Sequence, residues 1–293
     1  MSRRILLFGG TVLADRLADK LATLPETYVC RNGIATNFAH PIDLAIICER
    51  SKGSRELWQT SPATEMASYL GYLYNAFWKV QSHEIPHLVT IGSACEYPAT
   101  VATPYIPELL WDGWPDGDYR GAMLRILELF VKLQNDSGRL GHHIVLDSLY
   151  GPVDDFNENA ALIPALIYRC TEALYKKHET VTINSDGKAS RTFLHYDDAV
   201  EGILAVINNG RHFPGVINHG GDQQITVDKL ATIIKNFVGF PGELVYDLSQ
   251  SGGREESMLN CSLLQDGIGF KPVKRLIAGL EEVTRNYRQN YSA

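Results

Sequence analysis

The chain has 293 residues, of which 45% are hydrophobic and 21% are charged, a composition typical of folded globular proteins. Its formal net charge of −7 argues against nucleic acid or an anionic membrane as the main partner, and no apolar run is long enough to span a bilayer. The five cysteines show neither a CxxC pair nor the spacing of metal ligands. We therefore expect reduced thiols, no metal site and a cytoplasmic location.

The N-terminal segment reads as a strand, a glycine turn and a helix. Residues 5–8 are continuously apolar, Gly9, Gly10 and Thr11 follow, and leucines then recur every fourth residue over 13–21. This order is typical of a dinucleotide-binding unit, in which the first turn of the helix faces a pyrophosphate. Gly9, Gly10 and Thr11 are therefore expected to contact a cofactor. A plain αβ unit with a glycine turn is the alternative.

The second strand is expected at residues 28–31 and ends in a basic residue, Arg31. An acidic residue at this point would bind the adenine ribose of NAD, whereas an arginine suits the 2′-phosphate of NADP. A solvated surface arginine explains the same residue equally well. The expected cofactor is therefore NADP or NAD, with Arg31 favouring NADP.

Three further apolar runs predict buried strands, and one run of aliphatic and aromatic residues at helical spacing predicts a helix. The strands are expected at 43–48, 87–91 and 144–146, and the helix at 62–80. Strands that alternate with helices favour an α/β fold with a doubly wound parallel sheet of the Rossmann type. His142 and His143 precede the last of these strands and are expected at the surface.

A cluster of reactive side chains follows the strand that ends near Gly92. Ser93, Cys95 and Glu96 lie there, and Tyr119 stands at the start of a later segment with apolar residues at helical spacing. An open parallel sheet places its chemistry at the carboxyl ends of its strands. We therefore expect these four side chains to form the catalytic part of a site.

Four segments carry a resemblance to a known family. They are residues 92–98 (GSACEYP), 149–152 (LYGP), 162–167 (LIPALI) and 191–198 (RTFLHYDD). The chain resembles the extended short-chain dehydrogenases/reductases of the NAD-dependent epimerase/dehydratase family over nearly its whole length. Within that family it is most similar to the GDP-L-fucose synthases, which epimerise and reduce a GDP-4-keto-6-deoxy sugar with NADPH. The resemblance implies a nucleotide-sugar substrate.

The resemblance also implies an organisation for the chain. A dinucleotide-binding core would comprise residues 1–152 and be completed by about 181–225, and a nucleotide-sugar lobe would comprise 153–180 and 226–293. Such enzymes often form homodimers through a four-helix contact made by the Tyr-bearing helix and the one before it. Four apolar residues suit such a contact and suit a monomer core equally: Leu124, Leu127, Phe130 and Val131.

Residue roles follow from the resemblance position by position. It implies that Ser93 hydrogen-bonds the keto oxygen, that Tyr119 donates a proton and contacts the cofactor, and that Cys95 is the base of the epimerisations. Arg169 would hold the substrate diphosphate and Arg191 would be another nucleotide-binding arginine, since an arginine can donate two parallel hydrogen bonds to phosphate. Two other substrate contacts depart from the family pattern: Ser148 replaces an asparagine, and a basic pair near the C-terminus is missing, with Arg254 as the nearest replacement.

Two departures affect the chemistry itself. The family's lysine four residues after the tyrosine is Met123, and its epimerisation histidine is Ala161. The lysine lowers the pKa of the tyrosine, and a tyrosine without a nearby cation titrates at about 10. Arg120 and Arg125 are close in sequence, but their angles around the helix differ from that of position 123.

Three functions remain open at this point. The first is a reductase of a nucleotide-linked keto sugar that uses Ser93 and Tyr119. The second is a dehydratase or epimerase in which Cys95 and Glu96 act as an acid–base pair. The third is a relative that binds nucleotide sugar or cofactor without turnover, which Met123 and Ala161 favour.

Overall fold

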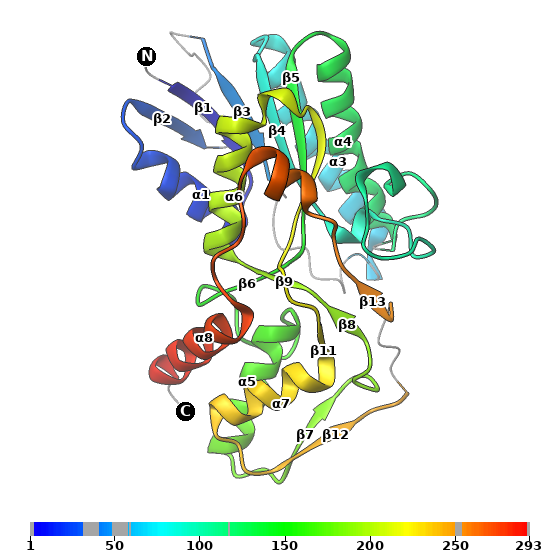
Figure 1. Ribbon diagram of the computed structural model, residues 1–293, viewed down its shortest axis with the longest axis vertical. Coiled ribbons are helices and arrows are strands. Elements are labelled where there is room, and N and C mark those ends of the chain that lie inside the picture. Colours follow the sequence, from blue (N-terminus) through cyan, green and yellow to red (C-terminus); the bar gives the residue numbers. More distant parts are fainter. Residues whose placement is uncertain are drawn as a thin grey trace. The chain divides into compact units, whose positions relative to one another are not determined.

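The computed structural model describes residues 3–31, 41–48, 58, 60–116, 118–249 and 254–291. The chain forms two compact units (Figure 1). Unit 1 comprises residues 1–146, 199–219 and 260–271, and unit 2 comprises residues 147–198, 220–259 and 272–293. The chain therefore passes between the units several times, and each unit is assembled from segments that are distant in sequence.

Unit 1 is built on a six-stranded sheet in which every pair of neighbours is parallel. In spatial order its strands are β10 (Gly215–His219), β5 (Leu140–Leu146), β4 (His87–Ser93), β3 (Leu44–Ile47), β1 (Arg3–Phe8) and β2 (Thr27–Arg31). The inner strands are apolar because both of their faces are covered, as expected for a parallel sheet. The predicted α/β fold with a doubly wound parallel sheet is confirmed.

The strand order contains one reversal that matters for function. From β1 the chain moves outward to β2 at the sheet edge, and it then returns to β3 on the other side of β1. The carboxyl ends of β1 and β3 therefore flank a topological switch point, and ligands of open α/β sheets bind in the crevice there.

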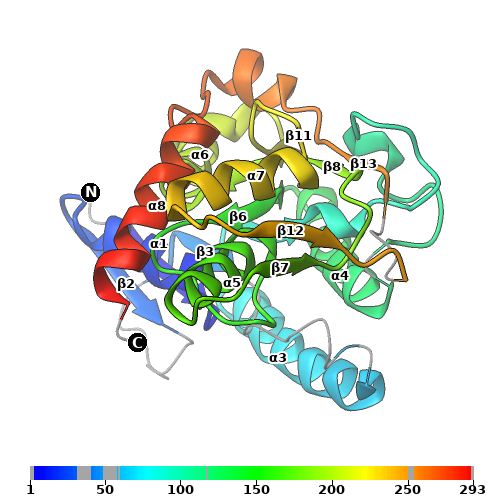
Figure 2. The ribbon, with the colours of Figure 1, turned by 90° about the horizontal axis from the view of Figure 1, so that it is seen from below.

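Helices cover both faces of this sheet. They are α1 (Val12–Ala22), α3 (Pro62–Ser82), α4 (Asp118–Asp136) and α6 (Tyr196–Asn209). Figures 1 and 2 show α3 and α4 side by side on one face, whereas α1 and α6 lie on the other. Leu124, Leu127 and Val131 of α4 are buried in the core against this face, so they do not form a dimer contact.

The prediction that His142 and His143 lie at the surface is wrong. All seven residues of β4 pair with β5, so β5 begins earlier than its apolar run and includes both histidines, which are fully buried. His142 donates to the Gly210 carbonyl (2.9 Å) and accepts from His87 (2.9 Å). Burial lowers the pKa of His87 to about 3 and also lowers that of His142, so both rings stay neutral near pH 7.

Unit 2 packs three helices around its own apolar core (Figure 2). The helices are α5 (Leu162–Tyr175), α7 (Val227–Val238) and α8 (Leu276–Asn290). Thr226 caps α7, because its hydroxyl accepts from the Lys229 N–H. Apolar side chains of all three helices, such as Ile167, Ile234 and Leu280, meet in this core.

Unit 2 also contains three small sheets. They are β6 (Ser148–Tyr150) with β9 (Phe193–His195), β7 (Thr180–Ile183) with β12 (Glu243–Tyr246), and β11 (Ile225–Thr226) with β8 (Ser190–Arg191) and β13 (Glu256–Ser257). Residues 181–198 therefore belong to unit 2, where their strand partners lie, and do not complete the sheet of unit 1 as expected. Residues 260–271 were expected in the nucleotide-sugar lobe but belong to unit 1.

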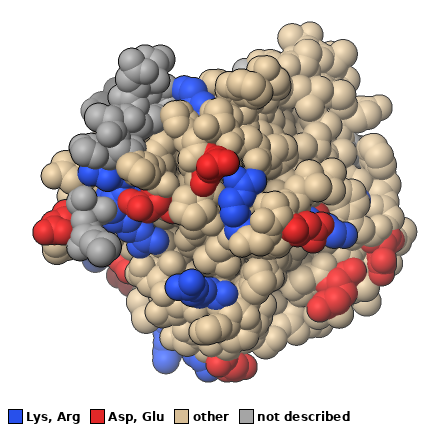
Figure 3. All heavy atoms as spheres, turned by 90° about the horizontal axis from the view of Figure 1, so that it is seen from above, with Lys and Arg blue, Asp and Glu red and all other residues tan. Residues whose placement is uncertain are grey.

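The remaining helical turns are short. They are η1 (Ala94–Glu96), η2 (Pro107–Leu109), η3 (Gly210–His212) and η4 (Leu263–Ile268). On the face drawn in Figure 3, basic and acidic side chains are interspersed over a largely uncharged surface. None of the helices in the described part of the chain has the length and apolar character needed to cross a membrane.

Candidate active site

The glycine turn lies at the switch point of the unit 1 sheet. β1 ends at Phe8, and Gly9 has a φ of 139°, a conformation that favours glycine because a Cβ would be strained there. Thr11 is the N-cap of α1, and its hydroxyl accepts from the Ala14 N–H (3.4 Å). The turn therefore leads directly into a helix N-terminus, which is a favourable place for a phosphate.

Arg31 lies against this turn. Its Nη2 donates to the Gly9 carbonyl (3.1 Å) and to Asp15 Oδ1 (2.8 Å), and its side chain is only 30% exposed. Its Nε is buried and has no hydrogen-bond partner in the described part of the chain. A cation at the end of β2, beside the glycine turn, fits a 2′-phosphate, so these residues fit the phosphate-bearing end of NADP.

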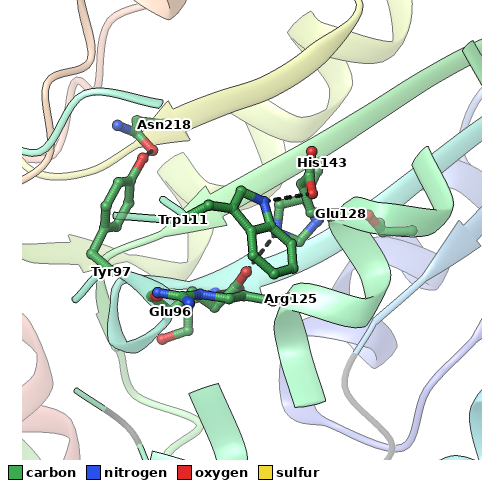
Figure 4. Close-up of polar contacts among 9 residues, drawn as sticks. Glu96, Tyr97, Trp111, Arg125, Glu128, His143 and Asn218 are labelled. Atoms are coloured by element: carbon green, nitrogen blue, oxygen red, sulfur yellow. Dashed lines mark hydrogen bonds and ion pairs between the residues drawn. The ribbon is translucent and has the colours of Figure 1, made fainter. Parts of the chain in front are cut away.

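The turn after β4 is held from beneath by Glu96. The Ser93 N–H donates to Glu96 Oε1 (2.7 Å), and His143 Nε2 donates to Glu96 Oε2 (2.9 Å), as Figure 4 shows for the His143 pair. Both side chains are fully buried, and His143 Nδ1 also meets Thr90 Oγ1 (2.8 Å). Glu96 therefore points into the protein, and in this arrangement it does not contact a substrate as the second hypothesis required.

Gly92 is part of the same arrangement. A Cβ at this position would overlap both Glu96 Oε1 and His143 Nε2. The absence of a side chain at position 92 thus lets the carboxylate and the imidazole meet directly behind the Ser93 backbone.

Two further contacts fix the chain on either side of η1. The Tyr97 hydroxyl donates to Asn218 Oδ1 (2.8 Å), which joins the turn to β10, and burial raises the pKa of this tyrosine well above its usual range. Arg125 of α4 donates from Nε to the Glu96 carbonyl (2.8 Å) and from Nη1 to the Gly113 carbonyl (2.8 Å). Its guanidinium also lies 5.3 Å from the centre of the Trp111 ring (Figure 4).

Tyr119 lies in the first turn of α4, next to the turn that carries Cys95. Its side chain is 47% exposed, and its ring meets that of Trp114 edge-on with centroids 6.3 Å apart. Arg120 Nη1 donates to Cys95 Sγ (3.3 Å), and a Cβ at Gly121 would overlap the Cys95 carbonyl. The first turn of α4, which carries Tyr119, therefore packs on the turn that carries Cys95.

Met123 occupies the place of the missing lysine. It is 9% exposed and belongs to the apolar core beneath α3 and α4. The helix therefore presents an apolar group one turn after Tyr119. The residues fit NADP at the phosphate end of the crevice, whereas the family's cationic contact to the nicotinamide ribose has no counterpart at position 123.

The expected substrate residues lie in unit 2. Arg169 donates to the carbonyls of Glu158 (3.1 Å) and Thr182 (3.3 Å) and lines a cavity of about 320 Å³ together with Lys176 and His178. Glu158 and Glu172 line the same cavity, and Lys176 is paired with Glu172, so side chains of both charges surround this space. Ala161, immediately before α5, provides no side-chain cap.

The other predicted substrate residues lie near the small sheet of β8 and β13. Arg191 donates to the Ser190 carbonyl (2.8 Å), and the Ser190 N–H donates to the carbonyl of Glu255 (2.7 Å), the residue after Arg254. Arg191 lies opposite Ser257 in this sheet, and Arg254 is three residues before Ser257. Ser148 begins β6 and is exposed.

Sequence reasoning missed three residues that shape this site: His143, Arg120 and Arg125. The length of the neighbouring strand could have revealed His143, because a seven-residue β4 needs a partner of similar length. Arg120 and Arg125 were judged only by their angle relative to position 123. Neither the angle nor the spacing indicates that they face the turn after β4.

By its fold, the chain is a doubly wound α/β protein with a polar cluster at the carboxyl edge of its sheet. The sequence profile of the NAD dependent epimerase/dehydratase family matches residues 23–220, more than half of the chain. The chain belongs to this family. The match includes Ser93, Tyr119 and Arg169, but it begins after the glycine turn and ends before Arg254.

Curated relatives and solved structures give the same picture. A protein described as probable GDP-L-fucose synthase 1 of Oryza sativa is 31% identical over 209 residues. The matched region covers 69% of this chain and 62% of the rice protein, so the chain spans less than two thirds of that relative's length. GDP-L-fucose synthase 1 of Arabidopsis thaliana is 29% identical over 79% of this chain and 72% of that protein. The structure of a GDP-mannoheptose C4 reductase from Campylobacter jejuni with NADP bound covers 98% of both chains, with a TM-score of 0.83 and 20% identity.

Proposed function

We propose that the chain is an NADP-dependent enzyme that modifies a GDP-linked 4-keto sugar. The observation that supports this proposal is the packing of the first turn of α4, which carries Tyr119, on the turn after β4, where Arg120 donates to Cys95 Sγ and Gly121 lies against the Cys95 carbonyl. Relatives described as GDP-L-fucose synthases support the substrate class.

In this proposal, the chain's own residues act on a carbonyl. The hydroxyls of Ser93 and Tyr119 hold the keto oxygen, and the Tyr119 hydroxyl supplies the proton as the carbonyl is reduced. The bound cofactor supplies a hydride. Glu96 acts only through the backbone that it supports, because its carboxylate is buried against Ser93 N–H and His143.

NADP is the preferred cofactor in this proposal. Arg31 places a partly buried cation beside Gly9, and a solved structure of the same fold was determined with NADP bound. On the substrate side, Arg169, Arg191 and Arg254 would bind the diphosphate, since guanidinium groups suit phosphate oxygens. Ser148 is the fourth residue proposed for substrate contact.

A second candidate function is binding without turnover. It is favoured by Met123, whose burial in the core leaves no cation one helical turn after Tyr119. Such a protein would hold NADP or a nucleotide sugar and leave the sugar unchanged.

The experiment has two stages. Fluorescence titration of the full chain with NADPH and with NADH should show tighter binding of NADPH, and Arg31→Gln should reduce this preference. NADPH oxidation is then followed with a GDP-4-keto-6-deoxy sugar for the wild type, for Tyr119→Phe and for the control Tyr175→Phe, which changes an exposed tyrosine on α5.

The expected result is turnover that Tyr119→Phe reduces by about 100-fold or more and that Tyr175→Phe leaves unchanged. Binding of NADPH without turnover in the wild type would select the second candidate. If neither NADPH nor NADH binds, the first candidate is wrong, and the second is left with a nucleotide sugar as its ligand.

We also propose that the protein forms a homodimer through the outer faces of α3 and α4. Several large apolar side chains on these faces are exposed: Leu70, Tyr74, Trp78, Leu129 and Leu133. Exposed apolar patches of this kind mark interaction surfaces. Trp78→Glu should convert the dimer to a monomer in size-exclusion chromatography, whereas Tyr28→Glu on β2 should not, and a monomeric wild type would contradict the proposal.

A further inference from the structure

Arg120 is one of the residues of α4 that contact the turn after β4. Its Nη1 lies 3.3 Å from Cys95 Sγ. The backbone on both sides is fixed at this point, because Gly121 packs directly against the Cys95 carbonyl and Arg125 binds the carbonyl of Glu96. The approach of guanidinium and sulfur is therefore set by the packing of α4 on η1.

The chemistry of this contact favours an anionic sulfur. A guanidinium remains charged at all ordinary pH values, and a cation beside a cysteine stabilises its thiolate relative to the thiol. Arg125 adds to the same field: burial lowers the pKa of its guanidinium, while charges on Glu96 and Cys95 oppose this shift. Because such coupling is reciprocal, a charged Arg125 also favours the negative form of Cys95.

Position 123 of the same helix supplies no cation that could stabilise the anionic form of Tyr119, because Met123 stands there and is buried in the core. We infer that Arg120 is a positioning residue that holds Cys95, the base that the family resemblance implies, as a thiolate. Cys95 is partly exposed, which gives a ligand access to it.

The consequence for the reaction rests on the proposed function. The Cys95 thiolate removes a proton from a carbon next to the keto group, so a C–H bond breaks and an S–H bond forms. The electron pair moves to the carbonyl oxygen, where the hydroxyls of Ser93 and Tyr119 bind the enolate. Return of the proton from sulfur to carbon restores the thiolate, and no oxidant or reductant is consumed.

The test measures thiol reactivity and needs no substrate. The folded full chain is alkylated with iodoacetamide from about pH 5 to about pH 9, and modification of Cys95 is quantified by peptide mass spectrometry. Cys30, the other partly exposed cysteine in the described part of the chain, is an internal reference in the same samples. The variants are Arg120→Gln, Arg120→Lys and the control Arg285→Gln, which removes an exposed cation from α8.

We expect the reactivity midpoint of Cys95 to lie at least about one pH unit below the value near 8.5 of a free thiol. Arg120→Gln should raise the midpoint by about one pH unit, which is about a tenfold loss of thiolate at pH 7. Arg120→Lys should restore most of the shift, and Arg285→Gln should have no effect. A wild-type midpoint near 8.5, or an unchanged midpoint in Arg120→Gln, would overturn the inference.

A second measurement covers the case in which Arg120→Gln fails to fold. The pH titration of thiolate absorbance is compared between the wild type and Cys95→Ser, and the difference must titrate below the free-thiol value. Deuterium uptake from D₂O into a GDP-4-keto-6-deoxy sugar without NADPH then tests the reaction step. If the Cys95 midpoint is low but no deuterium is taken up, the thiolate assignment stands and the proposed substrate is wrong. If deuterium is taken up but the Cys95 midpoint equals that of a free thiol, the proposed role of Arg120 is wrong.

Discussion

Glu96→Ala should be among the most destabilising single substitutions in unit 1. The carboxylate accepts from the Ser93 N–H (2.7 Å) and from His143 Nε2 (2.9 Å), and both side chains are fully buried. Alanine would leave two buried polar groups without partners, at about 1–3 kcal/mol each. We therefore expect the free energy of unfolding to fall by roughly 2–6 kcal/mol.

Glu96→Gln separates hydrogen bonding from charge. The Gln amide oxygen can still accept from the Ser93 N–H, and its NH₂ can donate to His143 Nε2 if the ring proton moves to Nδ1 and is donated to Thr90 Oγ1, which lies 2.8 Å away. Both bonds survive in this tautomer. The expected cost is therefore only about 1 kcal/mol.

Urea unfolding at neutral pH measures both variants, with the denaturant slope checked for constancy. The reasoning would be refuted if the two substitutions cost the same, or if Glu96→Ala cost less than about 1 kcal/mol. Ser93 provides a local readout, because its backbone amide should exchange with solvent faster in Glu96→Ala than in Glu96→Gln.

Three other outcomes are expected. Gly92→Ala should lower the free energy of unfolding by about as much as Glu96→Ala, because the new Cβ overlaps the carboxylate. The two losses should not add in the double variant. Additive losses in urea unfolding would contradict this. Burial raises the pKa of Asp147 from 3.8 to about 7. The protonated carboxyl therefore stabilises the fold fully below pH 3.8, and this stabilisation is lost as the pH rises to about 7. Asp147→Asn should abolish this decline in thermal unfolding curves, and an unchanged pH dependence in the variant would contradict the assignment. Met123→Lys should lower the melting temperature, because it introduces an ammonium into an apolar core. The same substitution should raise NADPH-dependent turnover. Unchanged turnover would show that the rest of the site does not use such a cation.

The sequence predicts the parts of this fold that depend on local pattern. Residues 5–8, the glycine turn and the leucines of α1 are read correctly because apolar periodicity and glycine directly reflect burial and backbone conformation. The same reasoning locates Ser93 and Tyr119 at the carboxyl edge of the sheet. Long-range pairing cannot be read in this way. Nothing near His143 in the sequence indicates that this residue of β5 will bind Glu96, which follows the neighbouring strand β4.

The boundary between the units escapes sequence reasoning for a related reason. β8, β11 and β13 have two residues each, too few for any periodicity, and their partners are distant in the chain. Arg120 illustrates the same limit for side chains, because its position in α4 is predictable but its contact with Cys95 depends on how the helix packs on η1.

The bond between Tyr97 and Asn218 joins residues that are 121 positions apart. During synthesis, Ser93 and Cys95 leave the ribosome long before the strand that anchors their turn exists. We therefore expect the reactive thiol to acquire its surroundings late, after β10 has emerged. Alkylation of stalled nascent chains would reveal this as a change in Cys95 labelling once residue 218 has cleared the exit tunnel, and no change at that length would show that the turn forms without its anchor.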